Sequence, residues 1–278
     1  MARSKNKETA GPAARMVAFV VRHMRLRMGL TQDQLGEIIG YTGAAVSAME
    51  TLAQPVSDEM LMQLGQALGD DVEFFEGMRL WVRLERLPEE FRDYLLIEQK
   101  ALSMYLYAMN NIHGLFQTDG YARAQISGGY PPLSHERIEE LVLARMARKT
   151  NFDRTPMCHI ELVLDESALR RKFGSTEIMR EQYLYLAECA RYKNVTLQVL
   201  PLDIGLMGEN AGARGELNLV ETAEHTQVTY MEIQDESVLV TDPAKVSTYA
   251  QRYAKIRSQA LSAHESLAFI ERLAGEGT

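Results

Sequence analysis

Cysteine is scarce in this sequence: Cys158 and Cys189 are the only two among 278 residues. Two cysteines cannot hold a chain of this length in a disulfide framework, and neither stands at a metal-ligand spacing from a second cysteine or a histidine. The sequence therefore excludes the disulfide-rich secreted class and the cysteine-based zinc modules. We expect both side chains to be buried thiols in a reducing compartment.

Long hydrophobic runs are also missing. The longest apolar stretches, around residues 16–21 and 95–109, are too short or too interrupted for the ~20 apolar residues of a membrane-spanning helix. The amino end carries charges but no apolar stretch that leads to a small-residue cleavage site. We therefore expect a cytoplasmic protein that does not associate with membranes.

The motifs of common enzyme classes are absent as well. No HExxH, P-loop, GxSxG or dinucleotide-binding pattern occurs. A catalytic centre would need clustered ligands or a nucleophile beside a base. Asp165 and Glu166 follow a predicted strand, but a helix start, where acids favour the helix dipole, explains them more simply than acid–base chemistry. We expect no catalysis, no cofactor and no metal site. The histidines after residue 100 are widely spaced: His113, His135, His159, His225 and His264.

Basic residues are concentrated at the amino end. Residues 1–30 contain seven Lys and Arg side chains and one acid, Glu8, which is a formal charge of +6, whereas the whole chain carries −8. The remaining residues therefore carry −14. A basic module on an acidic body is typical of a protein that places one end against nucleic acid, although a short disordered basic tail has the same composition.

Four short helices are predicted before residue 70. The spacing of apolar residues favours a first helix over 13–28, with Met16, Val20, Met24 and Met28 recurring at i+4 and Gly29 ending it. N-cap residues and following glycines predict further helices at 32–39, 43–51 and 58–68. The side chains predicted to face the core are Leu35, Ile38, Ile39, Val46, Met49, Leu61, Leu64 and Leu68. The methionines expected to be packing residues are Met16, Met24, Met28, Met49, Met60 and Met62.

The segment from Gly29 to Thr51, GLTQDQLGEIIGYTGAAVSAMET, carries the most informative pattern in the chain. Thr31 and Thr42 are good N-caps for two helices, and a tight glycine-containing turn separates them. This arrangement is typical of a helix-turn-helix, in which the second helix enters the major groove of double-stranded DNA. We therefore predict a DNA-binding domain.

The periodicity changes after residue 100. Two more helices, over 72–86 and 89–99, are predicted to connect the bundle to the rest of the chain. Period-two alternation then predicts strands at 102–109, 160–164, 195–199, 216–220, 228–233 and 238–240. Helical patterns lie between them at 135–150, 176–192 and 243–273, and a long loop is predicted at 203–215.

The predicted fold class is a mainly α N-terminal helix-turn-helix bundle followed by an α+β C-terminal domain. The expected organisation is a mobile basic arm at 1–12, a helix-turn-helix domain at 13–70, a helical connector at 71–99 and an α+β regulatory or interaction domain at 100–278.

The helix-turn-helix resembles the Xre/Cro type. A Thr-Gln pair opens its first helix, leucine and small residues pack inward, and Val-Ser followed by Glu closes its second helix. The residues that carry this likeness are Thr31, Gln32, Leu35, Gly36, Gly40, Val46, Ser47 and Glu50.

Motifs beyond residue 70 are similar to the C-terminal domain of actinobacterial Xre-type regulators of the WhiJ-like family. They are HGLFQTDGYARAQI (113–126), HIELVLDESALRR (159–171), NVTLQVLPLDIG (194–205) and ESLAFIERL (265–273). The resemblance implies an antitoxin-like regulator of development or secondary metabolism that works with a small partner protein encoded nearby, and it does not imply an enzyme.

The resemblance also implies which residues face the bases. Gly43, Ala44, Ser47 and Ala48 take positions where the family frequently has larger Gln, Arg or Asn side chains, and such small residues cannot make bidentate hydrogen bonds to base edges. Thr42 and Ser47 can bond a phosphate or a base edge, and the alanines can touch a thymine methyl group. Specificity is then expected to depend partly on the N-terminal arm and on DNA shape.

Further contacts are expected around the helix-turn-helix. Gln32 is positioned for a phosphate at the N-terminus of its helix, and Arg22, Arg25 and Arg27 either contact phosphates or form a solvated face. Leu52 stands where the family often has a glycine, so the end of the second helix is expected to differ.

The expected function is therefore that of a sequence-specific transcriptional regulator that binds DNA as a homodimer. Its C-terminal domain would receive the control signal from a small partner protein or a ligand. The alternative is a protein-interaction or ligand-binding module in which DNA binding is weak or lost, because the predicted recognition helix carries few large side chains.

Overall fold

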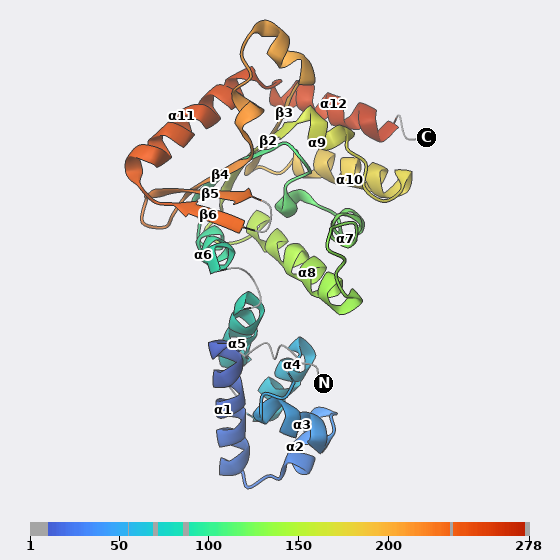
Figure 1. Cartoon of the computed structure of the whole chain (residues 1–278), viewed down its shortest axis with the longest axis vertical. Helices are drawn as coiled ribbons and strands as arrows, with labels where there is room; N and C mark the ends of the chain where they lie inside the picture. The colour runs from blue at the N-terminus through green and yellow to red at the C-terminus, as the bar shows by residue number, and fades with distance from the viewer. Residues whose placement is uncertain (1–10, 55, 69–71, 86–88, 234–235, 276–278) are drawn as a thin grey trace, which may run out of the picture. The chain divides into compact units, whose positions relative to one another are not determined.

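The computed structural model describes residues 11–54, 56–68, 72–85, 89–233 and 236–275. The chain divides into two compact units, one up to Arg92 and one from Asp93 onward (Figure 1). The first unit is helical and the second contains a mixed sheet with helices, so the predicted fold class is confirmed. Most of the predicted N-terminal arm, residues 1–10, lies outside the described residues.

The N-terminal unit is a small helical bundle. Its helices are α1 (Pro12–Arg27), α2 (Gln32–Ile39), α3 (Gly43–Glu50), α4 (Asp58–Leu68) and α5 (Val72–Glu85). Thr31 and Thr42 cap α2 and α3 as predicted, and the Ser57 hydroxyl accepts a bond from the Met60 amide at the start of α4. The segment predicted as the first half of a connector, α5, packs into this bundle because Phe75 and Val82 belong to its core.

The prediction that Met16, Met24 and Met28 are packing residues is correct for Met24, which is partly buried against the core, and wrong for the other two. The buried apolar residues of α1 are Val17, Ala18 and Val21, none of which belongs to the predicted i+4 series. Apolar side chains occur on both sides of α1, so their spacing did not identify the buried side. The predicted core or packing residues that are exposed are Met16 (54%), Met28 (52%), Ile38 (55%) and Met62 (39%).

The C-terminal unit is built on one six-stranded sheet. The strands are β1 (Ser103–Ala108), β2 (His159–Asp165), β3 (Val195–Leu200), β4 (Leu217–Glu221), β5 (Gln227–Ile233) and β6 (Glu236–Val240). Their order is β3-β2-β1-β4-β5-β6. The first three strands are parallel, and β4, β5 and β6 continue the sheet in antiparallel pairs.

Helices cover this sheet. They are α6 (Glu89–Glu98), α7 (Asp119–Ser127), α8 (His135–Ala147), α9 (Glu166–Arg170), α10 (Thr176–Cys189), α11 (Pro243–Gln259) and α12 (Ala263–Gly275). Tyr253 and Ile256 of α11 pack on a core with Tyr107 of β1 and Leu219 of β4. Both cysteines are buried free thiols, as expected.

Two predictions for the C-terminal unit need correction. The single helix predicted over 243–273 is two helices, because the Leu261 amide leaves the helical ladder and bonds the carbonyl oxygen of Val199 at 2.9 Å. The loop predicted at 203–215 contains two short 3₁₀ turns, Leu202–Met207 and Ala211–Arg214. No helix in the described part of the chain is long and apolar enough to cross a membrane.

Candidate nucleic-acid interface

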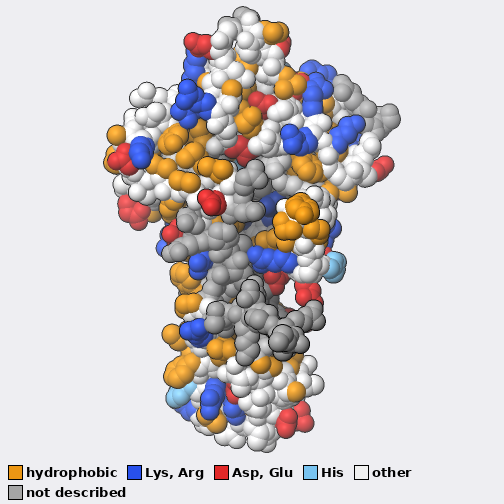
Figure 2. Space-filling view, in the orientation of Figure 1, with side chains coloured by type: hydrophobic (Ala, Val, Ile, Leu, Met, Phe, Trp, Pro, Cys, Tyr) orange, Lys and Arg blue, Asp and Glu red, His pale blue; other side chains and the backbone are white. Residues whose placement is uncertain are grey.

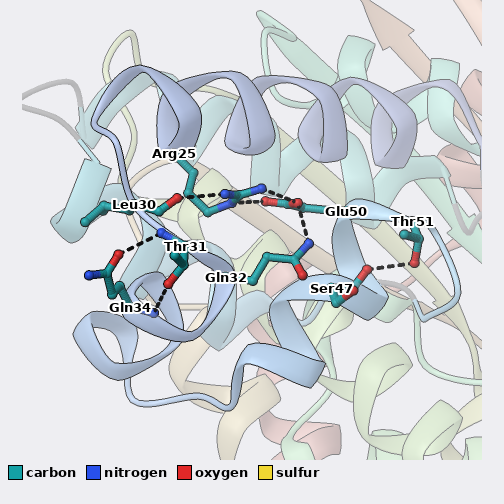
Figure 3. Close-up of polar contacts among 8 residues, drawn as sticks. All are labelled: Arg25, Leu30, Thr31, Gln32, Gln34, Ser47, Glu50 and Thr51. Atoms are coloured by element: carbon teal, nitrogen blue, oxygen red, sulfur yellow. Dashed lines mark hydrogen bonds and ion pairs between the residues drawn. The ribbon is translucent and has the colours of Figure 1, made fainter.

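Local hydrogen bonds fix the ends of α2 and α3, the two helices of the predicted helix-turn-helix. The Thr31 hydroxyl accepts from the Gln34 amide at 3.2 Å, and the Gln34 side chain accepts from the Thr31 amide at 2.8 Å (Figure 3). This reciprocal capping box satisfies two of the amides that α2 leaves unpaired. Gly40 then adopts φ +73°, which ends α2 at little steric cost because glycine has no Cβ.

Gly36 lets the two helices approach closely. A Cβ atom placed on Gly36 would lie 2.7 Å from the carbonyl oxygen of Tyr41 and 2.9 Å from the amide nitrogen of Gly43. Both neighbours are backbone atoms, so no side-chain rotation can relieve the contact. The angle between α2 and α3 therefore depends on glycine at this position.

Gly43 has a packing role that the resemblance did not predict. A Cβ atom there would lie 1.8 Å from Oδ1 of Asp33, so the Asp33 carboxylate occupies the space beside the first residue of α3. A negative charge at a helix N-terminus is favourable. Gly43 is half-buried, and its contribution to a DNA contact can only come from its backbone.

A charged cluster joins the first three helices. Arg25 of α1 donates from Nε to Glu50 Oε1 at 2.6 Å and from Nη2 to Oε2 at 2.9 Å, and its Nη1 donates to the carbonyl oxygen of Leu30 at 2.8 Å (Figure 3). Gln32 of α2 donates from Nε2 to Glu50 Oε2 at 2.8 Å. The side chains of Arg25 and Glu50 are only 8% and 3% exposed.

Electrostatics favour the charged forms of this pair. The hydrogen bond from Arg25 to Glu50 raises the pKa of the guanidinium although burial opposes its charge. Burial also opposes the charge of Glu50, but hydrogen bonds from Arg25 and Gln32 and the positive charge of Arg25 outweigh it and lower the pKa of the carboxyl. Glu50 thus anchors α3 to α1 and α2 as a buried carboxylate.

This geometry changes the expected role of Arg25. All three of its guanidinium nitrogens are bonded inside the bundle, so we withdraw Arg25 from the candidate phosphate contacts and assign it to positioning α3. The Gln32 amide group is partly used in the same way, which leaves its oxygen for another donor. Sequence reasoning missed the pair because its two residues are 25 positions apart.

The remaining candidate residues are accessible. Arg22 and Arg27 of α1, Thr42 and Ala44 are exposed, and Ser47 is half-buried. The Thr42 hydroxyl already accepts from the Ala45 amide at 3.2 Å. In Figure 2, basic side chains lie among hydrophobic ones over the N-terminal bundle, at the bottom of the view.

A leucine in a left-handed conformation follows the end of α3. The helix ends at Glu50, and Leu52 adopts φ +59°, a left-handed conformation that side chains other than glycine and asparagine rarely take. The Thr51 hydroxyl donates to the carbonyl oxygen of Ser47 at 2.7 Å and closes the last turn. The chain therefore leaves α3 through a left-handed residue, at the cost of a strained leucine.

Comparison with known proteins identifies the C-terminal unit. Residues 91–272 match a family described as a domain of unknown function, DUF5753. The chain belongs to this family. No curated protein and no solved structure matches the chain.

The DUF5753 domain has a polar interior beside α8. Arg148 donates to Glu98 from Nε at 2.9 Å and from Nη2 at 2.6 Å, and Asn151 donates to the same carboxylate at 3.2 Å. Arg145 donates from Nη1 to the side-chain oxygens of Gln117 and Gln125, both at 2.9 Å. Burial lowers the pKa of Arg145 to about 10. These contacts link α6, α7 and α8.

Two surface hollows of about 450 Å³ and 460 Å³ lie on the DUF5753 domain. The first contains Lys149 and Tyr185, and the second contains Ser103, His159 and His225. Volumes of a few hundred Å³ are in the range of small-molecule sites. Within the described residues, no group of His, Cys, Asp and Glu side chains is arranged to hold a metal ion.

The acidic pair at the end of β2 has a structural role. The Asp165 carboxylate caps α9 by accepting from the Ser167 amide at 2.9 Å, and Glu166 accepts from the side chain of Arg170 at 2.6 Å. The interpretation of this pair as a helix start is confirmed.

Proposed function

We propose that this protein is a transcriptional regulator that binds double-stranded DNA through α2 and α3. The observation that carries the proposal is the fixed geometry of this helix pair. Gly36 sets the approach of the helices and the Arg25–Glu50 pair holds α3, while Thr42, Ala44 and Ser47 are left on an accessible side. A recognition helix must be positioned in this way before its N-terminal half can enter a major groove.

We propose that the protein acts as a homodimer. One recognition helix reads only a few base pairs, so regulators of this kind gain affinity by binding two half-sites about one helical turn apart. The C-terminal DUF5753 domain is proposed to receive the regulatory input, from a small partner protein or a ligand. Its surface hollows have a suitable size for a ligand.

The direct test is an electrophoretic shift of genomic DNA fragments, repeated at increasing salt concentration. Retention of a subset of fragments in excess competitor DNA is expected for a sequence-specific regulator. Small side chains at Ala44 and Ser47 favour a second candidate, an interaction module without DNA binding. Absence of any shift, with the N-terminal bundle shown to be folded, would support that candidate and reject the first.

The exposed arginines of α1 provide a first prediction. Replacing Arg22 or Arg27 with alanine should weaken binding to all fragments about equally, because a phosphate contact carries no sequence information. Each lost contact should reduce the slope of log affinity against log salt by about 0.9. Binding titrations at several salt concentrations measure this slope.

The matched control is Arg214→Ala, which removes an exposed arginine from the C-terminal unit. It should leave the salt slope unchanged. A changed fragment preference with an unaltered slope in the Arg22 or Arg27 variants would contradict their assignment to phosphates.

A further inference from the structure

The two edge strands of the sheet in the C-terminal unit differ in whether other parts of the chain bond their outer backbone groups. At the β3 edge, the Val199 amide donates to the Ser266 hydroxyl and the Val199 carbonyl accepts from the Leu261 amide, both at 2.9 Å. The Gln198 side chain adds a bond to the Leu261 carbonyl at 2.7 Å. The connection between α11 and α12 and the first turn of α12 therefore satisfy the outer backbone groups of Val199, near the end of β3.

The β6 edge has no such cover. β6 is the last strand of the sheet (Figure 1), and within the described residues no loop or side-chain hydrogen bond reaches Glu236–Val240 from its outer side. Every second residue of an edge strand directs its N–H and C=O groups away from the one strand with which the edge strand pairs. These groups form a template for another strand.

The composition of β6 does not protect this edge. Sheet edges are commonly guarded by charged side chains, above all lysine, by proline or by a bulge. β6 reads ESVLV: its one charged residue, Glu236, stands at its first position, it has no lysine or proline, and it pairs with β5 in an unbroken register. Val238 and the neighbouring Ile233 are 39% and 58% exposed, although both are large apolar residues. An open edge with exposed apolar side chains is typical of an interaction surface.

We propose that β6 pairs with β6 of a second copy of this chain, antiparallel about a two-fold axis perpendicular to the sheet. Such an axis keeps corresponding faces on the same side, so directly opposed residues share a face. The two six-stranded sheets then continue as one. The contact is isologous, as in most homodimers, and it closes after two copies.

Charge favours one of two registers near the middle of β6. Centring the pair on Val238 places Glu236 opposite Val240 of the second copy. Centring it on Leu239 would instead bring Glu236 toward Asp242, the N-cap of α11 just beyond the strand, and like charges so placed repel. The Val238-centred register also creates an apolar row across the dimer, because Met231 of β5 is the neighbour of Val238 in each copy.

The mass of the full chain in solution tests this proposal without DNA, so its outcome is independent of the proposed DNA binding. Light scattering over a concentration series should approach twice the chain mass of 31.4 kDa. Val238→Lys should return the mass to one chain, because two lysines would face each other at the centre of the pair. Leu206→Lys is the matched control, since Leu206 is 85% exposed and lies outside the sheet. It should remain a dimer.

Cysteine crosslinking tests the register. Opposed residues of an antiparallel pair have Cβ atoms about 4.5–5.5 Å apart, close enough for a disulfide after small adjustment. Val238→Cys should therefore form a crosslinked dimer under mild oxidation, and the native cysteines contribute little because both are buried. Glu236→Cys should not, because its two copies would be offset by about 13 Å along the strands.

Three results would overturn the proposal. A wild-type chain that keeps the mass of one copy would show that β6 does not pair with a second copy. A Val238→Lys variant that stays dimeric would place the dimer interface elsewhere. Equal crosslinking of the Glu236→Cys and Val238→Cys variants would reject the register.

Discussion

Replacing Glu50 with alanine is expected to lower the free energy of unfolding of the N-terminal bundle by about 3–5 kcal/mol. The change leaves the Arg25 guanidinium, 8% exposed, without its carboxylate, and an unpaired buried charge is strongly destabilising. It also removes the acceptor of the Gln32 side chain. Because α3 loses its link to α1 and α2, the proposed specific DNA binding should be lost together with stability.

Denaturant titration can follow this bundle selectively. The only tryptophan of the chain, Trp81, lies in α5, so its fluorescence reports on the N-terminal unit. Glu37→Ala is the matched control: it removes an exposed glutamate from α2 and should change stability by less than about 0.5 kcal/mol. Equal effects of the two substitutions would show that the Glu50 pair does not stabilise the bundle.

A double variant separates the loss of attraction from the cost of an unpaired charge. Replacing Arg25 with methionine and Glu50 with leucine removes both charges and leaves apolar side chains in a buried site. Exchanging a buried ion pair for packed apolar residues is often neutral or stabilising. The double variant should therefore recover most of the stability that Glu50→Ala loses.

The free energy of unfolding of the N-terminal bundle should fall at acidic pH because of Glu50. The pKa of Glu50 is lower in the folded than in the unfolded protein, because Arg25 and Gln32 bond its charged form. Its stabilising contribution is therefore complete above the unfolded pKa of about 4.3 and is lost as the pH falls through the folded pKa. The Glu50→Ala variant should lack this part of the acid dependence.

Local signals made much of the fold predictable. The caps of α2 and α3 depend on Thr31 and Thr42 and on amides within three residues of each, so the sequence placed both helix starts correctly. The strands of the C-terminal unit were predicted to within two residues at each end, because alternating apolar residues mark them in the sequence, although β1 and β2 are buried on both faces. Such features need no knowledge of distant segments.

Features that depend on distant residues were not predictable. The partner of Arg25 is 25 positions away, so the arginine could not be distinguished from the exposed Arg22 and Arg27. The break between α11 and α12 carries no proline or glycine, since it is set by hydrogen bonds to Gln198 and Val199. Strand order likewise depends on pairing between segments far apart in the chain.

Replacing Gly36 with alanine, a better helix-forming residue, is expected to destabilise the N-terminal bundle. Alanine in place of a helical glycine is normally favourable by about 1 kcal/mol. At Gly36, however, the added Cβ would lie 2.7 Å from the Tyr41 carbonyl oxygen, which is part of the turn backbone. We expect Gly36→Ala to cost about 1–3 kcal/mol, and Gly36→Val to cost more, because α2 and α3 must move apart.

Gly77 of α5 is the matched control for this prediction. It is also a helical glycine of the N-terminal bundle, but a Cβ added there would meet no atom within 4 Å. Gly77→Ala should therefore stabilise the bundle by up to about 1 kcal/mol, opposite in sign to Gly36→Ala. Trp81 fluorescence during denaturant titration measures both changes, and DNA binding should fall only for the Gly36 variants. A stabilising Gly36→Ala would mean that the turn adapts to a side chain, and that the close approach of α2 and α3 does not set their angle.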